Sequence, residues 1–69
     1  MRLSLVGFLR RRPYVVRFVE PQSRRDGLGQ WLIEMAGIPP TLFPAASGDT
    51  EATVRETTER ILMRVLPEE

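Results

Sequence analysis

The chain has 69 residues, a formal net charge of +1 and no Cys, His or Lys. A chain of this length buries only about 60% of the surface that its unfolded state exposes, so we expect one domain with one small core. The missing residue types exclude disulfides, thiolate metal sites and the most common catalytic bases and nucleophiles. We therefore expect a protein that is not an enzyme, needs no cofactor or metal and has no small-molecule substrate.

Charge and hydropathy also bear on partners and location. Ten basic residues, all Arg, oppose nine acidic ones, so the net charge does not favour wholesale binding to nucleic acid or to an anionic membrane. The apolar run 3–9 is too short to span a bilayer, and no signal cleavage site follows it. We expect a soluble, cytoplasmic protein that does not bind membranes.

The first two predicted elements form a hairpin. Residues 2–8 alternate in character, with Leu3 and Leu5 on one side. Residues 14–19 read Tyr-Val-Val-Arg-Phe-Val, which is rich in β-branched and aromatic side chains. The connector 10–13, Arg-Arg-Arg-Pro, suits a polar turn. The pattern predicts two antiparallel strands.

The next predicted element is a helix between Ser23 and Gly37. Ser23 is a suitable N-cap, and Asp26, three residues later, completes a capping box. Apolar residues then follow at helical spacing, namely Leu28, Trp31, Leu32 and Met35. Gly37 and the Pro-Pro pair after Ile38 would end the helix. We expect its apolar stripe to pack on the hairpin.

The remaining segments are less distinct. Residues 41–49 read as an extended or looped segment, interrupted by Pro44. With a period of 3.6, residues 50–66 form a helix that starts at an Asp49 N-cap and places Val54, Ile61, Leu62, Val65 and Leu66 near one face. With a period of two, residues 60–66 form a strand, and the Thr-rich segment before them is a poor helix former. The residue pattern alone slightly favours the helix.

Several short motifs resemble ubiquitin and its relatives. Val-Glu-Pro at 19–21 and Gly-Ile-Pro-Pro at 37–40 have the same identity and spacing as in ubiquitin, and residues 56–64 resemble ubiquitin's last strand without gaps. The resemblance implies an α+β fold, a small ubiquitin-like β-grasp with a hairpin, a helix, a reduced third strand and a C-terminal strand at 60–66. The alternative, from the 3.6 period, is a β-hairpin plus two helices.

The chain departs from the ubiquitin pattern in two places. Arg17 falls where ubiquitin has a core residue, so either the second strand shifts register and turns Tyr14, Val16 and Phe18 inward, or the alignment fails there. The segment between Pro40 and residue 56 is also about ten residues shorter than in ubiquitin, as judged from the aligned motifs.

The resemblance implies a non-enzymatic protein-protein interaction or adaptor module. Residues 65–69 read Val-Leu-Pro-Glu-Glu in place of a diglycine, so conjugation is not implied. Ubiquitin-like domains without a conjugating tail include some associated with bacterial secretion and conflict systems. The residues that correspond to ubiquitin's exposed binding patch are Phe8, Leu42, Phe43, Arg60 and Leu62. Taken singly, Phe8 and Leu62 are more readily explained as core residues.

Two further classes of function remain open. Arg10, Arg11 and Arg12, with Phe8 and Tyr14 nearby, could grip phosphates and stack on bases, although a solvated hairpin turn explains so short a run better. The chain could also be an obligate homo-oligomer or a subunit of a larger complex, whose final segment packs on a second chain.

Overall fold

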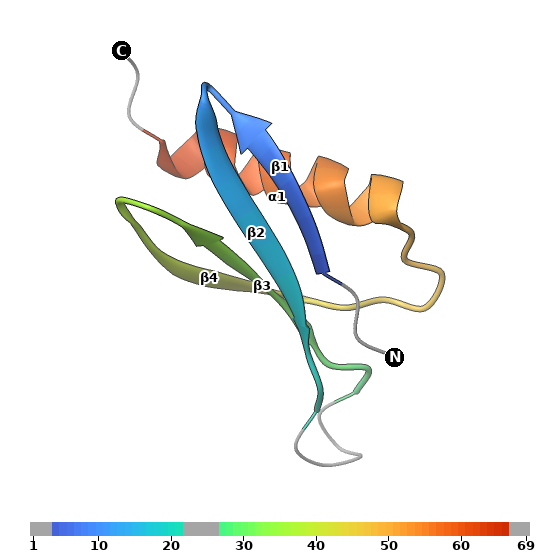
Figure 1. The fold of residues 1–69 in the computed structure, drawn as a ribbon. Helices are drawn as coiled ribbons and strands as arrows, with labels where there is room; N and C mark the ends of the chain where they lie inside the picture. The colour runs from blue at the N-terminus through green and yellow to red at the C-terminus, as the bar shows by residue number, and fades with distance from the viewer. Residues whose placement is uncertain (1–3, 22–26, 67–69) are drawn as a thin grey trace.

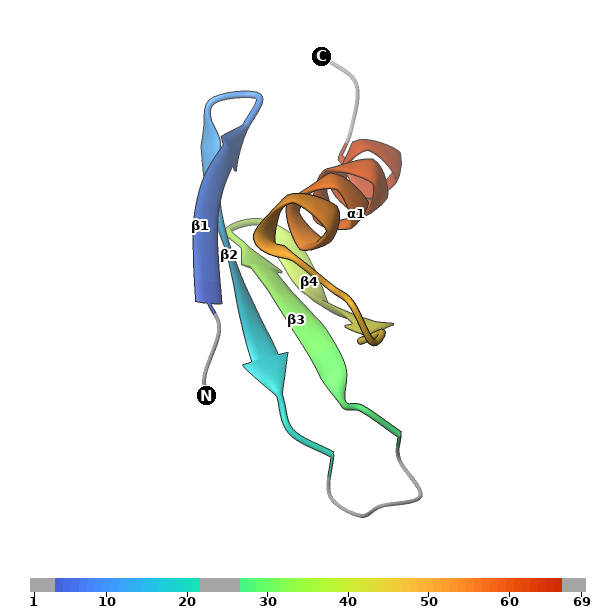
Figure 2. The ribbon, with the colours of Figure 1, turned by 90° about the vertical axis from the view of Figure 1, so that its right-hand side faces the viewer.

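The computed structural model describes residues 4–21 and 27–66 (Figure 1). Its elements are the strands β1 (Ser4–Leu9), β2 (Arg12–Val19), β3 (Gln30–Met35) and β4 (Ile38–Pro44), followed by the helix α1 (Glu51–Val65). The strands form one antiparallel sheet in the order β1-β2-β3-β4, and α1 lies across one face of it (Figure 2). No helix in the described part of the chain is long and apolar enough to cross a membrane.

The predicted hairpin is confirmed. β1 pairs with β2 so that Val6 lies opposite Val15, and the turn consists of Arg10 and Arg11. Both turn residues have positive φ angles, 51° and 67°, a combination that a tight two-residue hairpin turn demands. Pro13, expected in the connector, belongs instead to β2.

The predicted helix between Ser23 and Gly37 is wrong, because residues 30–35 form β3. Apolar Trp31, Ile33 and Met35 alternate with the residues between them, and this period of two buries all three side chains against the helix side of the sheet. Gly37, with φ 84°, lies in the β3–β4 turn rather than at a helix end. The expected caps, Ser23 and Asp26, lie outside the described residues.

The helical interpretation of the final segment is confirmed, and the strand interpretation of residues 60–66 is wrong. The N-cap is Thr50 rather than Asp49, since the Thr50 side chain accepts from the Thr53 backbone while the Thr53 hydroxyl accepts from the Thr50 backbone. Thr53, one of the threonines that argued against a helix, therefore stabilises its start.

The α+β class is confirmed, but the β-grasp implied by the resemblance is not. That arrangement requires a helix between the second and third strands and a strand at the end, whereas here α1 follows all the strands. The alternative of a β-hairpin plus two helices is also wrong, because β3 and β4 extend the hairpin into a larger sheet.

The core lies between the sheet and α1. Its buried side chains are Leu5, Tyr14, Val16, Trp31, Ile33, Met35, Val54, Leu62 and Leu66. Arg17 points to the other side of the sheet, as the shifted register of the second strand predicts. Phe18 is half-buried on the core side and packs edge-on against Trp31, with ring centroids 5.2 Å apart. The burial of apolar side chains in this one layer stabilises the folded state of the chain.

Candidate functional site

The sheet has one face that α1 covers and one face that it leaves open (Figure 2). In β1, Leu5 and Gly7 are buried toward the helix, whereas Val6 and Phe8 are exposed on the opposite side. The same alternation continues along the other strands through the ladder register. We call this second side the open face; it includes Ser4, Val6, Phe8, Pro13, Val15, Arg17, Leu32, Glu34, Pro40 and Leu42.

The open face is largely apolar. Phe8 is 70% exposed, Val6 59% and Leu42 51%, while Val15 and Leu32 are half-buried. The register places Val6 beside Val15 and Leu32 beside Leu42, so apolar side chains are present on every strand. The whole face, four strands about 4.8 Å apart and six residues long, covers about 400 Å². Exposed apolar side chains gathered on one face of a small protein often mark a functional surface.

One ion pair lies in the middle of the open face. Arg17 Nη2 is 2.7 Å from Glu34 Oε1, and both side chains are about half exposed. A pair this exposed contributes at most about 1 kcal/mol to stability. The pair matters more for the charge of the surface, because the two charges cancel and leave the centre of the open face neutral.

A shallow hollow of about 380 Å³ adjoins the open face. Its walls include Pro13, Val15, Glu34 and Pro40. Phe8 stands directly beside it, since Phe8 and Pro13 are partners in the ladder. The rings of two prolines hold the walls in fixed positions. The hollow can therefore accept an apolar side chain of a partner next to the exposed Phe8 ring.

Positive charge borders the hollow. Arg10 and Arg11, which we call the arginine turn, are exposed at the end of the hairpin from which β2 and Pro13 start. Arg12 is half-buried, and its Nη1 atom lies 3.8 Å from the position that a Cβ on Gly37 would occupy. The three arginines named as candidate nucleic-acid ligands thus share one end of the sheet, with two of them at its rim.

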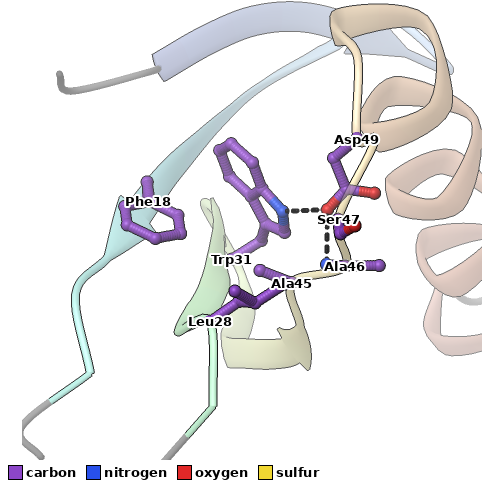
Figure 3. A pocket seen from close by; sticks show the side chains of 7 residues that line it. All are labelled: Phe18, Leu28, Trp31, Ala45, Ala46, Ser47 and Asp49. Atoms are coloured by element: carbon purple, nitrogen blue, oxygen red, sulfur yellow. Dashed lines mark hydrogen bonds between the residues drawn. The ribbon is translucent and has the colours of Figure 1, made fainter. Parts of the chain in front are cut away.

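A second cavity, of about 300 Å³, lies where the β4–α1 loop meets β3 (Figure 3). Trp31 Nε1 and the Ala46 backbone N–H both donate to Asp49 Oδ2, at 3.0 and 2.8 Å. The Ala46 bond, and then the Trp31 bond, hold the pKa of Asp49 below its usual range. We assign Asp49 the structural role of fastening the loop to β3.

A polar cluster joins α1 to the hairpin on the covered face. Tyr14 donates to Glu59 Oε2 at 2.7 Å, and Arg55 Nη1 donates to the Tyr14 hydroxyl at 3.3 Å and to the Val6 carbonyl at 3.1 Å. Gly7 leaves room for this contact, because a Cβ there would lie 2.5 Å from Tyr14 and Arg55 atoms. Burial, and then the bond to Glu59, raise the pKa of Tyr14. The cluster is a structural link.

The five residues expected from the ubiquitin resemblance do not form one surface. Phe8 and Leu42 lie on the open face, on β1 and β4. Phe43 packs against the core from the covered face, and Leu62 is fully buried within the core. Arg60 is exposed on α1. The structure therefore joins Phe8 with Leu42 and separates both from Arg60 and Leu62.

Several open-face residues escaped the sequence interpretation. Val6 and Val15 were assigned only to strands, and Leu32 was assigned to a helical stripe. Glu34 had no role, and Pro40 was expected only to help end a helix. The available signal was the alternation within residues 30–35, which places Leu32 and Glu34 together on one side of a strand.

The described residues contain no group of three or more His, Cys, Asp or Glu side chains that could hold a metal ion. Comparison with protein-family models, curated proteins and solved structures finds no match to this chain. The functional assignment therefore depends on the geometry of the open face and its arginine rim.

Proposed function

We propose that this protein is a non-enzymatic interaction module that binds an acidic and apolar segment of another protein on its open face. The observation that carries the proposal is a second apolar face in a chain that already has a complete core. Val6, Phe8 and Leu42 add nothing to that core, because they point away from it. Their exposure is unfavourable in the free protein and becomes favourable once a partner removes them from water.

Charge complementarity identifies the chemistry of the partner. The arginine turn places positive charge beside the hollow, while the Arg17–Glu34 pair leaves the centre of the open face neutral. A partner that inserts an apolar side chain into the hollow and places a carboxylate near Arg10 or Arg11 would satisfy both features. A second copy of the chain suits the face less well, since its open-face acid, Glu34, is already paired.

A nucleic acid is a less suitable ligand for this surface. Tyr14, expected to stack on bases, is fully buried and hydrogen-bonded to Glu59. Phe8 is the one aromatic side chain on the open face as described, and aliphatic residues surround it. Single-strand binders combine a basic groove with several stacking rings, and this face does not present such a series.

The resemblance to ubiquitin-like proteins favours the same class of function. Members of that family without a conjugating tail act by being gripped by partners, and the motifs at 19–21 and 37–40 carry the resemblance here. A ubiquitin-like β-grasp origin remains a proposal. We place the binding surface on the open face rather than on Phe8 with Arg60 and Leu62.

The test compares two double variants that remove similar exposed apolar area. Phe8→Ser with Leu42→Ser changes the open face, and Met63→Ser with Val65→Ser changes the outer side of α1, where both residues are 49% exposed. Each protein is immobilised, and proteins retained from an extract of the source cells are identified by mass spectrometry. The retained partner is then purified and titrated by calorimetry.

We expect the open-face variant to bind the purified partner about tenfold or more weakly, and the helix variant to bind within about twofold of the unmodified chain. Circular dichroism should show the same fold for all three. Equal affinities of the three proteins would overturn the proposal. Retention of nuclease-sensitive material that is lost at high salt would favour nucleic acid instead.

A further inference from the structure

The two edges of the sheet differ in how they are protected. β4 contains Pro39, Pro40 and Pro44, which have no N–H to offer to another strand. β1 itself contains neither proline nor charge, and Arg55 of α1 reaches its outer side. Natural proteins usually blunt such an edge with charge, proline or a covering element. Arg55 meets one carbonyl of β1, and the apolar edge on either side of that contact is suited to pairing with another chain.

The contact with Arg55 indicates which backbone groups of β1 face outward. Its guanidinium passes over Gly7 and donates to the Val6 carbonyl from outside the β1–β2 ladder. The Val6 carbonyl therefore points away from β2, because a carbonyl bonded within the β1–β2 ladder would be out of reach of Arg55. Because backbone groups in an antiparallel strand alternate between its two sides, Ser4 and Phe8 face outward with Val6.

We propose that the outer edge of β1 receives an extended segment of the partner as an additional strand. The inference rests on the proposed function, because the same three residues, Ser4, Val6 and Phe8, also present their side chains on the open face. A strand added there would extend that face with its own side chains. Main-chain hydrogen bonds would supply affinity, and the apolar face would select alternating apolar residues.

The arginine turn gives this strand a polarity. Arg10 and Arg11 follow directly from the end of β1, so a strand that runs antiparallel to β1 begins beside them. Acidic residues at the start of the incoming segment would meet this positive charge. We therefore infer a segment with two acidic residues followed by alternating apolar and polar ones.

The turn geometry supports a binding role for these arginines. Arg10 and Arg11 are the non-Gly residues with positive φ in the described chain, at 51° and 67°. Such turns favour Asn-Gly, and two arginines are not the residues that this backbone prefers. The backbone preference of the turn alone does not select arginines here, and exposed guanidinium groups beside the open face suit recognition of a negative charge.

A second copy of the chain fits the edge less well. In antiparallel self-pairing of β1, the segment facing the arginine turn would come from residues 1–3, which contain Arg2 and no acidic residue. Like charges would then meet at both ends of the new pair. The occupant that the charges favour is a segment of a different protein.

The test uses a synthetic ten-residue peptide, two glutamates followed by alternating valine and threonine, titrated into isotopically labelled protein at low salt and followed by NMR. The control peptide carries two lysines in place of the glutamates. We expect the acidic peptide to shift the amide signals of Ser4, Val6 and Phe8 and to bind about tenfold more tightly than the lysine peptide.

Two variants separate edge pairing from other modes of contact. Val6→Pro removes the outward N–H at a position where an edge strand tolerates proline, and Val6→Thr keeps that N–H and the β-branched shape. We expect Val6→Pro to abolish binding and Val6→Thr to stay within about threefold of the unmodified protein. Arg10→Asn with Arg11→Gly suits the turn better than the arginines do, so its loss of preference for the acidic peptide would not reflect unfolding.

Three outcomes would overturn strand addition at β1. The first is an absence of shifts at about 1 mM peptide, an affinity too weak to matter. The second is equal peptide binding by Val6→Pro and Val6→Thr. The third is a concentration-dependent dimer that Val6→Pro abolishes, which would make a second copy the occupant. The first two leave the proposed function to be decided by the Phe8 and Leu42 variants, so the two failures are distinguishable.

Discussion

The two faces of the sheet are both apolar, but α1 packs on one of them and the apolar side chains of the other stay exposed. On the covered face, Tyr14 and Trp31 are buried and their polar atoms bond to Glu59 and Asp49. On the open face, Phe8 and Leu42 stay more than half exposed. In a chain with a single described helix, only one side of the sheet is buried by the protein itself. The difference assigns stability to the covered face and supports the recognition role that we propose for the open one.

The largest effect on stability is expected from truncating a leucine on the covered face, and it is compared with the same truncation on the open face. Leu62→Ala should lower the free energy of unfolding by about 3 kcal/mol, because it opens a cavity in the fully buried core. Leu42→Ala should lower it by less than about 1 kcal/mol, since that side chain is 51% exposed. Urea unfolding followed by Trp31 fluorescence measures both. Similar losses for the two variants would contradict the division between the faces.

A smaller effect should follow from removing the Tyr14 hydroxyl. Tyr14→Phe breaks the bonds to Glu59 and Arg55 and should cost about 1–2 kcal/mol at neutral pH. Because the folded-state pKa of Tyr14 is raised, the stability due to the neutral phenol is complete below about pH 10 and is lost as the pH rises through the folded-state value.

The chain has one Tyr and no Lys or Cys, so this alkaline transition reports a single phenol. We expect the unmodified protein to lose stability between neutral pH and about pH 11, and Tyr14→Phe to lose less over the same range. Ultraviolet absorbance of the phenolate, recorded beside unfolding curves at each pH, checks the assignment. A Tyr14 that ionises below its ordinary range would contradict it.

The smallest effect, and a gain, is expected at the arginine turn. Arg10→Asn with Arg11→Gly should raise the free energy of unfolding by up to about 1 kcal/mol, since both positions have positive φ angles that these residues adopt more readily. Thermal unfolding at high and low salt measures the gain and shows whether relief of charge repulsion contributes to it. A loss of stability would mean that the arginines serve the fold rather than binding.

The hairpin and the final helix were predictable from sequence, whereas the middle of the fold was not. Tyr14, Val16 and Phe18 alternate with Arg17 in a pattern that only a strand satisfies, and residues 50–66 carry a helical stripe with good capping residues. In residues 28–36, Leu28, Trp31, Leu32 and Met35 fit a helix, while Trp31, Ile33 and Met35 fit a strand equally well.

The candidate site was predictable only in part, for the same reason. Phe8 and the arginines could be singled out because their strand and turn were assigned correctly. Leu42 was named, but its association with Val6, Val15 and Leu32 depends on β3, which the sequence interpretation did not contain, and on β4, of which it gave only an extended or looped segment at 41–49. Leu62 was assigned to the surface only through a strand that does not form, and α1 turns it into the core, as expected for this residue taken singly.

By itself the sequence determined the elements whose residues have one favourable period, namely the first hairpin and the final helix. Tertiary structure alone decided the conformation of residues 30–44. There, Trp31, Ile33 and Met35 gain burial by pairing with Phe18, Val16 and Tyr14, which are distant in sequence. The local strand or helix preference of these residues does not reflect this gain in burial, because their side chains become buried only when the hairpin and α1 pack around them.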